Sequence, residues 1–221
     1  ILPYTTLFRS EFLGQQVTVQ RIGADGSIDR AVSLIKELDG QVAAFGMGGI
    51  DLYIRGRTAT YTLKAALPIV EAAKKSPMVD GGGLKHILEK RLINYLDSNG
   101  IYSLKGKKAF VVAGLGHFGL MDSLTARGCE LAIGDIAFAL GLPVMFRSPD
   151  RLDRVAKVVA PLVCQLPYSM LYPTGKQQES STPRFGNWYH WSDFVTGDFP
   201  YMKRYMPFDM KGRAIITNTV T

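Results

Sequence analysis

The first hundred residues alternate between short apolar runs and segments with helical periodicity. The predicted strands are residues 17–22, 41–45 and 77–79. The predicted helices are residues 28–38, 63–75 and 84–96. Ser27 is positioned to cap the first helix, and Pro68 marks a kink or a late start of the second. Strands that alternate with helices in this way predict an α/β fold with a parallel sheet.

The second half of the chain continues the same alternation. The predicted strands are residues 109–113, 129–133, 142–146, 193–197 and 214–219. Helices are predicted over 120–126 and over 152–166, where Leu152, Val155, Val159, Leu162 and Val163 should face inward. Residues 172–191 are interrupted by proline and glycine, which predicts a loop.

This pattern divides the chain into two predicted domains. Residues 13–100 form an α/β substrate domain, and residues 101–221 form a Rossmann-like, doubly wound parallel sheet. Residues 1–12 begin without methionine and share no pattern with the rest of the chain, so we interpret them as a non-native flank. Because the chain stops just after a predicted strand, we expect the second domain to be truncated at its C-terminus.

Composition narrows the class of protein. The 221 residues carry 26 basic and 19 acidic side chains, a net charge of +7. This surplus could attract an anionic cofactor or a carboxylated substrate, or it could be ordinary solvated surface. Zinc-finger spacing and long basic runs are absent, and so is any apolar stretch of membrane-spanning length, so we predict neither nucleic-acid nor membrane binding. The two cysteines lie in apolar runs, which favours buried thiols in the cytoplasm.

A glycine-rich turn lies between the strand at 109–113 and the next helix. In Gly114-x-Gly116-x-x-Gly119, the first glycine would permit a tight turn and the second would let a diphosphate reach the backbone. The third would let helix and strand approach closely. Asp135 follows the next strand, where a carboxylate can hold ribose hydroxyls. The predicted cofactor contacts in this unit are Gly114, Gly116, His117, Phe118, Gly119 and Asp135. The other interpretation is a turn that serves packing alone.

Further candidate cofactor contacts follow other strands of the same predicted sheet, because ligands collect at the carboxyl ends of parallel strands. They are Arg147, Gly197, Asp198, Thr217 and Asn218. Asp135 would repel a 2′-phosphate and favours NAD, whereas Arg147 favours NADP; we predict NAD as the cofactor, with NADP as the alternative.

Candidate catalytic residues lie beside two glycine clusters in the first domain. Asp51 ends the cluster at 46–51, and Asp80 begins the cluster at 80–83. Lys85 follows on the first turn of a predicted helix, where it could accept a hydroxyl proton. The other interpretations are tight turns and a surface lysine, with Lys64 as a weaker candidate base. The three histidines lack metal-ligand spacing, so we predict no metal site.

With these residues in view, the chain resembles the shikimate and quinate dehydrogenase family. The segments that carry the resemblance are residues 45–53, 79–85, 171–175, 191–198 and 216–219. The resemblance implies an N-terminal substrate domain, a C-terminal nicotinamide domain, NAD or NADP as cofactor, and quinate, shikimate or a similar hydroxylated carboxylic acid as substrate. The family's Asn-x-Thr-x-Pro-x-Lys segment is absent, so its lysine and aspartate roles do not transfer by motif. A non-catalytic dinucleotide-binding sensor is the alternative, and a homodimer is left open.

Overall fold

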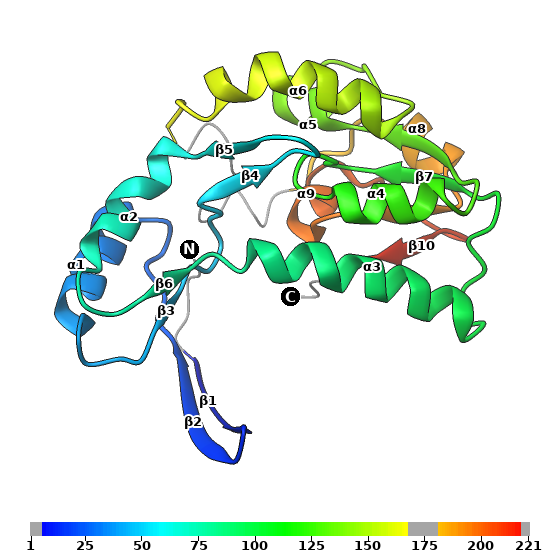
Figure 1. Cartoon of the computed structure of the whole chain (residues 1–221). Coiled ribbons are helices and arrows are strands. Elements are labelled where there is room, and N and C mark those ends of the chain that lie inside the picture. The colour runs from blue at the N-terminus through cyan, green and yellow to red at the C-terminus, as the bar shows by residue number, and fades with distance from the viewer. Residues whose placement is uncertain (1–5, 168–180, 218–221) are drawn as a thin grey trace. The chain divides into compact units, whose positions relative to one another are not determined.

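The computed structural model describes residues 6–167 and 181–217 and shows a mixed α/β protein with a four-stranded parallel sheet. The described residues divide into two compact units (Figure 1). Unit 1 holds residues 6–52, 63–81 and 166–167, and unit 2 holds residues 53–62, 82–165 and 181–217. We predicted a boundary near residue 100, whereas α3 (Gly82–Ser98) groups with unit 2.

Unit 1 begins with an antiparallel hairpin. Strands β1 (Thr6–Phe12) and β2 (Gln15–Arg21) pair along their full length, and every residue of β2 is exposed. Leu13 and Gly14, both with positive φ, form the turn between them. We predicted β2 but no strand before residue 13, because the pattern of β1 becomes informative only when it is read against its partner.

The rest of unit 1 holds two helices and a short parallel pair of strands. Ser27 caps α1 (Ile28–Leu38), as predicted, by accepting a hydrogen bond from the Arg30 amide at 3.2 Å. A 3₁₀ turn, η1 (Lys64–Ala66), precedes α2 (Leu67–Ala72), so Pro68 marks a late helix start. Strands β3 (Phe45–Gly46) and β6 (Met78–Val79) pair in parallel. The strand predicted at 41–45 is wrong except for its last residue, because these residues follow the end of α1 in turn geometry.

Unit 2 contains the four-stranded sheet. Its strands are β7 (Lys108–Val111), β8 (Glu130–Ile133), β9 (Phe194–Thr196) and β10 (Ala214–Ile216), in the order β8-β7-β9-β10 and all parallel. All four were predicted. The fifth predicted strand, residues 142–146, is wrong: within it only Phe146 pairs, in an isolated bridge with Ile133. The unpredicted helix α5 (Asp135–Leu140) ends at Gly141, whose φ of 72° turns the chain away from the sheet.

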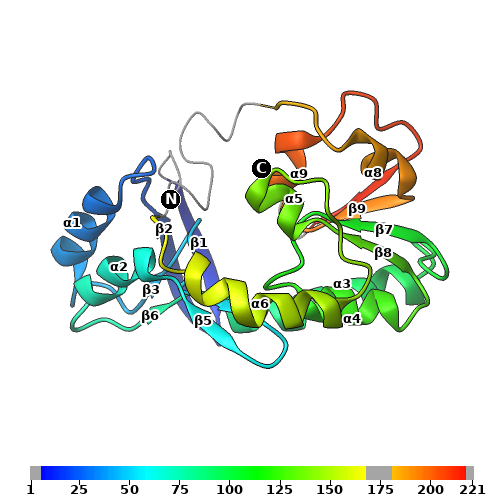
Figure 2. The same ribbon diagram turned by 90° about the horizontal axis from the view of Figure 1, so that it is seen from above.

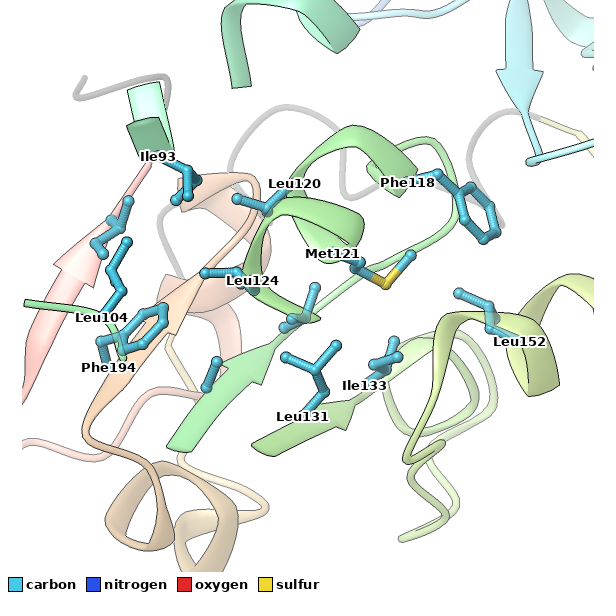
Figure 3. Packing of buried hydrophobic residues seen from close by; sticks show 13 residues of the cluster. Ile93, Leu104, Phe118, Leu120, Met121, Leu124, Leu131, Ile133, Leu152 and Phe194 are labelled. Atoms are coloured by element: carbon cyan, nitrogen blue, oxygen red, sulfur yellow. The ribbon is translucent and has the colours of Figure 1, made fainter. Parts of the chain in front are cut away.

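Helices cover both faces of this sheet, as Figure 2 shows. On one face, α3, α4 (Phe118–Thr125) and α6 (Pro149–Val163) pack on alternate strand residues; Figure 3 shows this core. On the other face lie α5, α8 (Gly186–Trp191) and α9 (Phe199–Tyr205). Because α8 occupies part of the loop predicted at 172–191, that prediction is wrong from residue 186 onward.

Helix α6 turns a different side to the sheet from the one predicted. Leu152 is buried as expected, but the other buried apolar positions are Ala156 and Ala160, at four-residue spacing. Val155 and Leu162, predicted to face inward, are 39% and 66% exposed. Alanines at the contact let the helix axis come close to its neighbours, which leaves the larger side chains outside.

A second hairpin joins unit 2 from an earlier part of the chain. Strands β4 (Tyr53–Arg55) and β5 (Thr60–Thr62) pair antiparallel, and neither was predicted. The Arg57 amide in its turn donates to Asp153 of α6 at 3.0 Å, and the Arg57 guanidinium also binds Asp122 and Asp150. Across the described residues, no helix is both long and apolar enough to span a membrane.

Candidate functional site

The three glycines of the turn after β7 have different physical roles. Gly116 has a φ of +92°, and a Cβ there would meet no atom within 4 Å, so only its backbone conformation requires glycine. A Cβ on Gly114 would lie 2.7 Å from Ile133 Cγ2, so this glycine serves packing rather than the tight turn we predicted. A Cβ on Gly119 would lie 2.8 Å from the His86 carbonyl oxygen, so the close approach joins α4 to α3 and not to a strand.

Four consecutive main-chain donors of this turn, the amides of residues 114–117, bind protein acceptors. The Gly114 and Leu115 amides donate to the two carboxylate oxygens of Asp135, each at 2.8 Å. The Gly116 amide donates to the Arg55 carbonyl at 3.1 Å, and the His117 amide donates to the Gly114 carbonyl at 2.8 Å. Burial raises the pKa of Asp135, and the two amide hydrogen bonds oppose that rise. Asp135 therefore holds the turn in shape from within the protein.

Beside the turn lies a chain of four ionisable side chains. His117, 2% exposed, is the N-cap residue of α4. Its Nδ1 lies 2.5 Å from Glu89 Oε1, and its Nε2 lies 3.3 Å from Asp198 Oδ2. The Nζ of Lys85 lies 3.3 Å from the same Asp198 oxygen. Lys85 and Glu89 are four residues apart on α3, so both project from one side of that helix.

These contacts set the charges of His117 and Asp198. Burial would lower the pKa of His117, but hydrogen bonds to Asp198 and Glu89 outweigh it and raise the pKa to about 9. Burial would raise the pKa of Asp198, but its contacts with His117 and Lys85 hold that pKa well below its usual range. At neutral pH His117 is therefore an imidazolium, and it contacts the ionised carboxylate of Asp198.

The four side chains lie where the strand order reverses. From β7 the connection runs to β8 on one side, whereas β9 lies on the other side. The glycine turn follows β7, and Gly197-Asp198 follows β9. In open parallel sheets, ligands bind at the carboxyl ends of the strands at this point. The Lys85 and Asp198 side chains are 22% and 30% exposed, so a ligand can reach this end of the site.

Two family models match the chain, and they cover different parts of it. Residues 83–221, more than half of the chain, match a family model described as Domain of unknown function (DUF8754). The chain belongs to this family. Residues 6–80 match a second model, Domain of unknown function (DUF8753). No curated protein and no solved structure matches the chain. All four side chains of the site lie inside the DUF8754 match.

The predicted catalytic residues are divided between the two units. Asp51 and Asp80 belong to unit 1, whereas Lys85 belongs to unit 2, so no single unit unites the predicted catalytic set. The Arg147 guanidinium lies 4.8 and 4.9 Å from the ring centroids of Trp188 and Trp191.

Of the remaining predicted cofactor contacts, Phe118 packs in the core at 3% exposure. Gly197 has a φ of +127°, and a Cβ there would lie 2.8 Å from Val112 Cγ2. Thr217 directly follows β10, and Asn218 lies outside the described residues.

Sequence reasoning missed Glu89 and the pairing of Lys85 with Asp198. One signal for Glu89 was available: it lies four residues after Lys85 and four before the buried Ile93, on the inward side of α3. The Lys85–Asp198 pair spans 113 residues and carries no local signal. Among the described residues, no group of three or more His, Cys, Asp or Glu side chains is arranged to hold a metal ion.

Proposed function

We propose that this chain is a cytoplasmic NAD(P)-dependent oxidoreductase. It would transfer a hydride between nicotinamide and a secondary alcohol of a small hydroxylated carboxylic acid such as quinate or shikimate. The linked side chains of Lys85, Asp198 and His117 near the carboxyl ends of β7 and β9 support the proposal. Oxidation of an alcohol needs a group that takes its proton, and ligands of open parallel sheets bind at this edge. The free thiols of Cys129 and Cys164 support the cytoplasmic location.

In the proposed reaction the protein moves one proton. Lys85 Nζ, after it has lost the proton that it carries in the ion pair, accepts the hydroxyl proton of the alcohol, and Asp198 Oδ2 holds the ammonium that forms again. His117 keeps Asp198 ionised through its Nε2 contact. A bound nicotinamide would supply the redox chemistry, as the acceptor of the hydride from the alcohol carbon.

The residues around the glycine turn fit a dinucleotide in part. The space beside Gly116 is open, and Asp135 follows β8, but both of its carboxylate oxygens already accept the Gly114 and Leu115 amides. The Leu115 and Gly116 amides already donate to Asp135 and Arg55, so a diphosphate bound at this edge would have to exchange with those acceptors. Binding is therefore expected to be weaker than at a turn with free amides.

One observation favours the second candidate, a dinucleotide-binding sensor without turnover. Lys85 is ion-paired with Asp198, and an ammonium must lose its proton before it can act as a base. In a sensor the pair would stay intact and serve only to hold the site together.

Cofactor titration and an absorbance assay separate these candidates. Binding of NAD and NADP is measured by calorimetry, and reduction is followed at about 340 nm with quinate and with shikimate as substrates. Turnover supports the oxidoreductase; binding without turnover supports the sensor; absence of binding removes both.

The variant Lys85→Ala tests the base. It should abolish turnover and leave cofactor affinity within about twofold, because a residue that acts only in the transition state contributes to kcat. Lys90→Ala is the matched control, since Lys90 is exposed on the same helix. Unchanged turnover in Lys85→Ala would remove Lys85 from the proposed mechanism.

A further inference from the structure

Glu89 is a buried acid that the proposed reaction does not use. It lies on α3 at 3% exposure. Its Oε1 lies 2.5 Å from His117 Nδ1, and its Oε2 is buried without a hydrogen-bond partner in the described part of the chain. A buried carboxylate with one unsatisfied oxygen is costly, so such a residue is expected to have a specific partner and role.

Within residues 6–167 and 181–217, the only positively charged partner of Glu89 is the ring of His117. Lys85, on the same helix, pairs with Asp198 instead, and the Asp135 carboxylate is satisfied by the turn amides. An ionised Glu89 beside a neutral imidazole would leave a buried charge uncompensated. The geometry is consistent when Nδ1–H donates to Glu89 and Nε2–H donates to Asp198, which requires a doubly protonated ring.

We propose that Glu89 is a positioning residue that holds His117 as an imidazolium, so that its Nε2–H orients the Asp198 carboxylate toward Lys85. This inference rests on the proposed function for its effect on turnover, but the state of the imidazole is independent of that function. His117 is then a fixed cation between two carboxylates rather than a general base. Without the charge of Glu89 the ring loses its proton more readily, and Asp198 loses an orienting donor.

Histidine side-chain ¹⁵N NMR on the full chain tests the imidazole directly. The His117 signals are assigned by their loss in His117→Gln. In the wild type, both ring nitrogens should stay protonated at neutral pH. In Glu89→Gln, which keeps the size but not the charge, the titration midpoint should fall by about one pH unit or more. Glu130→Gln is the control, since Glu130 is an exposed acid of the same unit and should leave the His117 signals unchanged.

The same variants report on the proposed reaction. Glu89→Gln should lower kcat by about tenfold or more and leave KM within about twofold, because the change acts through Asp198 and Lys85 and not on substrate contacts. Glu89→Asp retains the charge and should restore part of kcat and part of the titration midpoint, which a purely structural role would not do.

Every result of these experiments either supports or overturns the positioning role of Glu89. A neutral His117 ring in the wild type at neutral pH overturns the proposal, even if Glu89→Gln fails to fold. A midpoint that Glu89→Gln does not move overturns it as well. An imidazolium that depends on Glu89, in a protein that neither binds nor reduces NAD or NADP, removes the oxidoreductase and keeps the positioning role.

Discussion

The protonation of His117 predicts that the protein loses stability as pH rises above neutrality. The folded-state pKa of His117 is raised to about 9, from an ordinary value of 6.5. A raised pKa means that the folded state binds the proton more tightly than the unfolded state. The stabilisation that protonated His117 gives to the folded state is therefore complete below about pH 6.5. It decreases between about pH 6.5 and 9 and is lost above about pH 9.

The size of the effect follows from the shift. A difference of one pKa unit corresponds to about 1.4 kcal/mol, so the free energy of unfolding should fall by about 3 kcal/mol across this interval. Because the total free energy of unfolding of a folded protein is only about 5–15 kcal/mol, this loss is large enough to measure. The pKa of its partner Asp198 is held well below this interval, so Asp198 adds no slope within it.

The assay is urea unfolding at several pH values between about 6 and about 9.5, followed by tryptophan fluorescence. Trp188 and Trp191, the two tryptophans of the chain, both lie in α8 of unit 2 and report on that unit. The pKa values of the Cys129 and Cys164 thiols are raised by burial, so both add a loss of stability at the upper end of the range.

Two variants isolate the histidine from these thiols. His117→Gln should flatten the pH dependence below about pH 7.5, where nearly all thiols of the unfolded chain still carry their protons. His86→Gln, at an exposed position on α3, should keep the wild-type slope. A wild-type free energy of unfolding that stays level between about pH 6.5 and 8.5, or a slope that survives in His117→Gln below about pH 7.5, would refute the reasoning.

Three further predictions concern the turn and the helices around it. Gly119→Ala should cost about 1–3 kcal/mol in urea unfolding, because its Cβ would lie 2.8 Å from a carbonyl oxygen of α3. The control is Gly83→Ala on α3, which should be neutral or stabilising because a Cβ at residue 83 would meet no atom within 4 Å. Asp135→Ala should cost about 1–3 kcal/mol by the same assay, because two partly buried amides lose their acceptor; an effect below about 0.5 kcal/mol would mean that another acceptor replaces it. Leu152→Ala should lower the unfolding free energy by about 2–5 kcal/mol, whereas Val158→Ala, 72% exposed on the same helix, should change it by less than about 0.5 kcal/mol; equal effects would contradict the observed face of α6.

The parts of the fold that could be predicted are those with a local signal. The β7–turn–α4–β8 unit was predicted because apolar runs, glycines and an acid succeed one another within about one βαβ length. The short helices α5 and α8 were missed, since six residues are too few to display a helical period. The inward side of α6 was misassigned because Val155 and Leu162 outweigh alanines in any apolar count, although the alanines make the contact.

The residues of the site also divide into those with a local sequence signal and those without one. His117 and Asp198 were predicted as cofactor contacts from their places after strands, and Lys85 as a base from its place on the first turn of a helix. The contact between these side chains depends on β9 lying next to β7 in the sheet, and no local pattern specifies that strand order. Glu89 was missed because an acid on a helix usually faces solvent, and only the packing of α3 against α4 turns this one inward.

The hairpin β4–β5 means that the junction between the two family matches is not a place where the protein can be cut. The hairpin precedes that junction, yet it belongs to unit 2, where the Arg55 carbonyl accepts the Gly116 amide and the Arg57 amide binds α6. A fragment that begins at residue 83 would keep the whole sheet but lose an acceptor of the glycine turn and the anchor of α6. An excised C-terminal half should therefore expose an unsatisfied turn and unfold more easily than the same residues in the full chain.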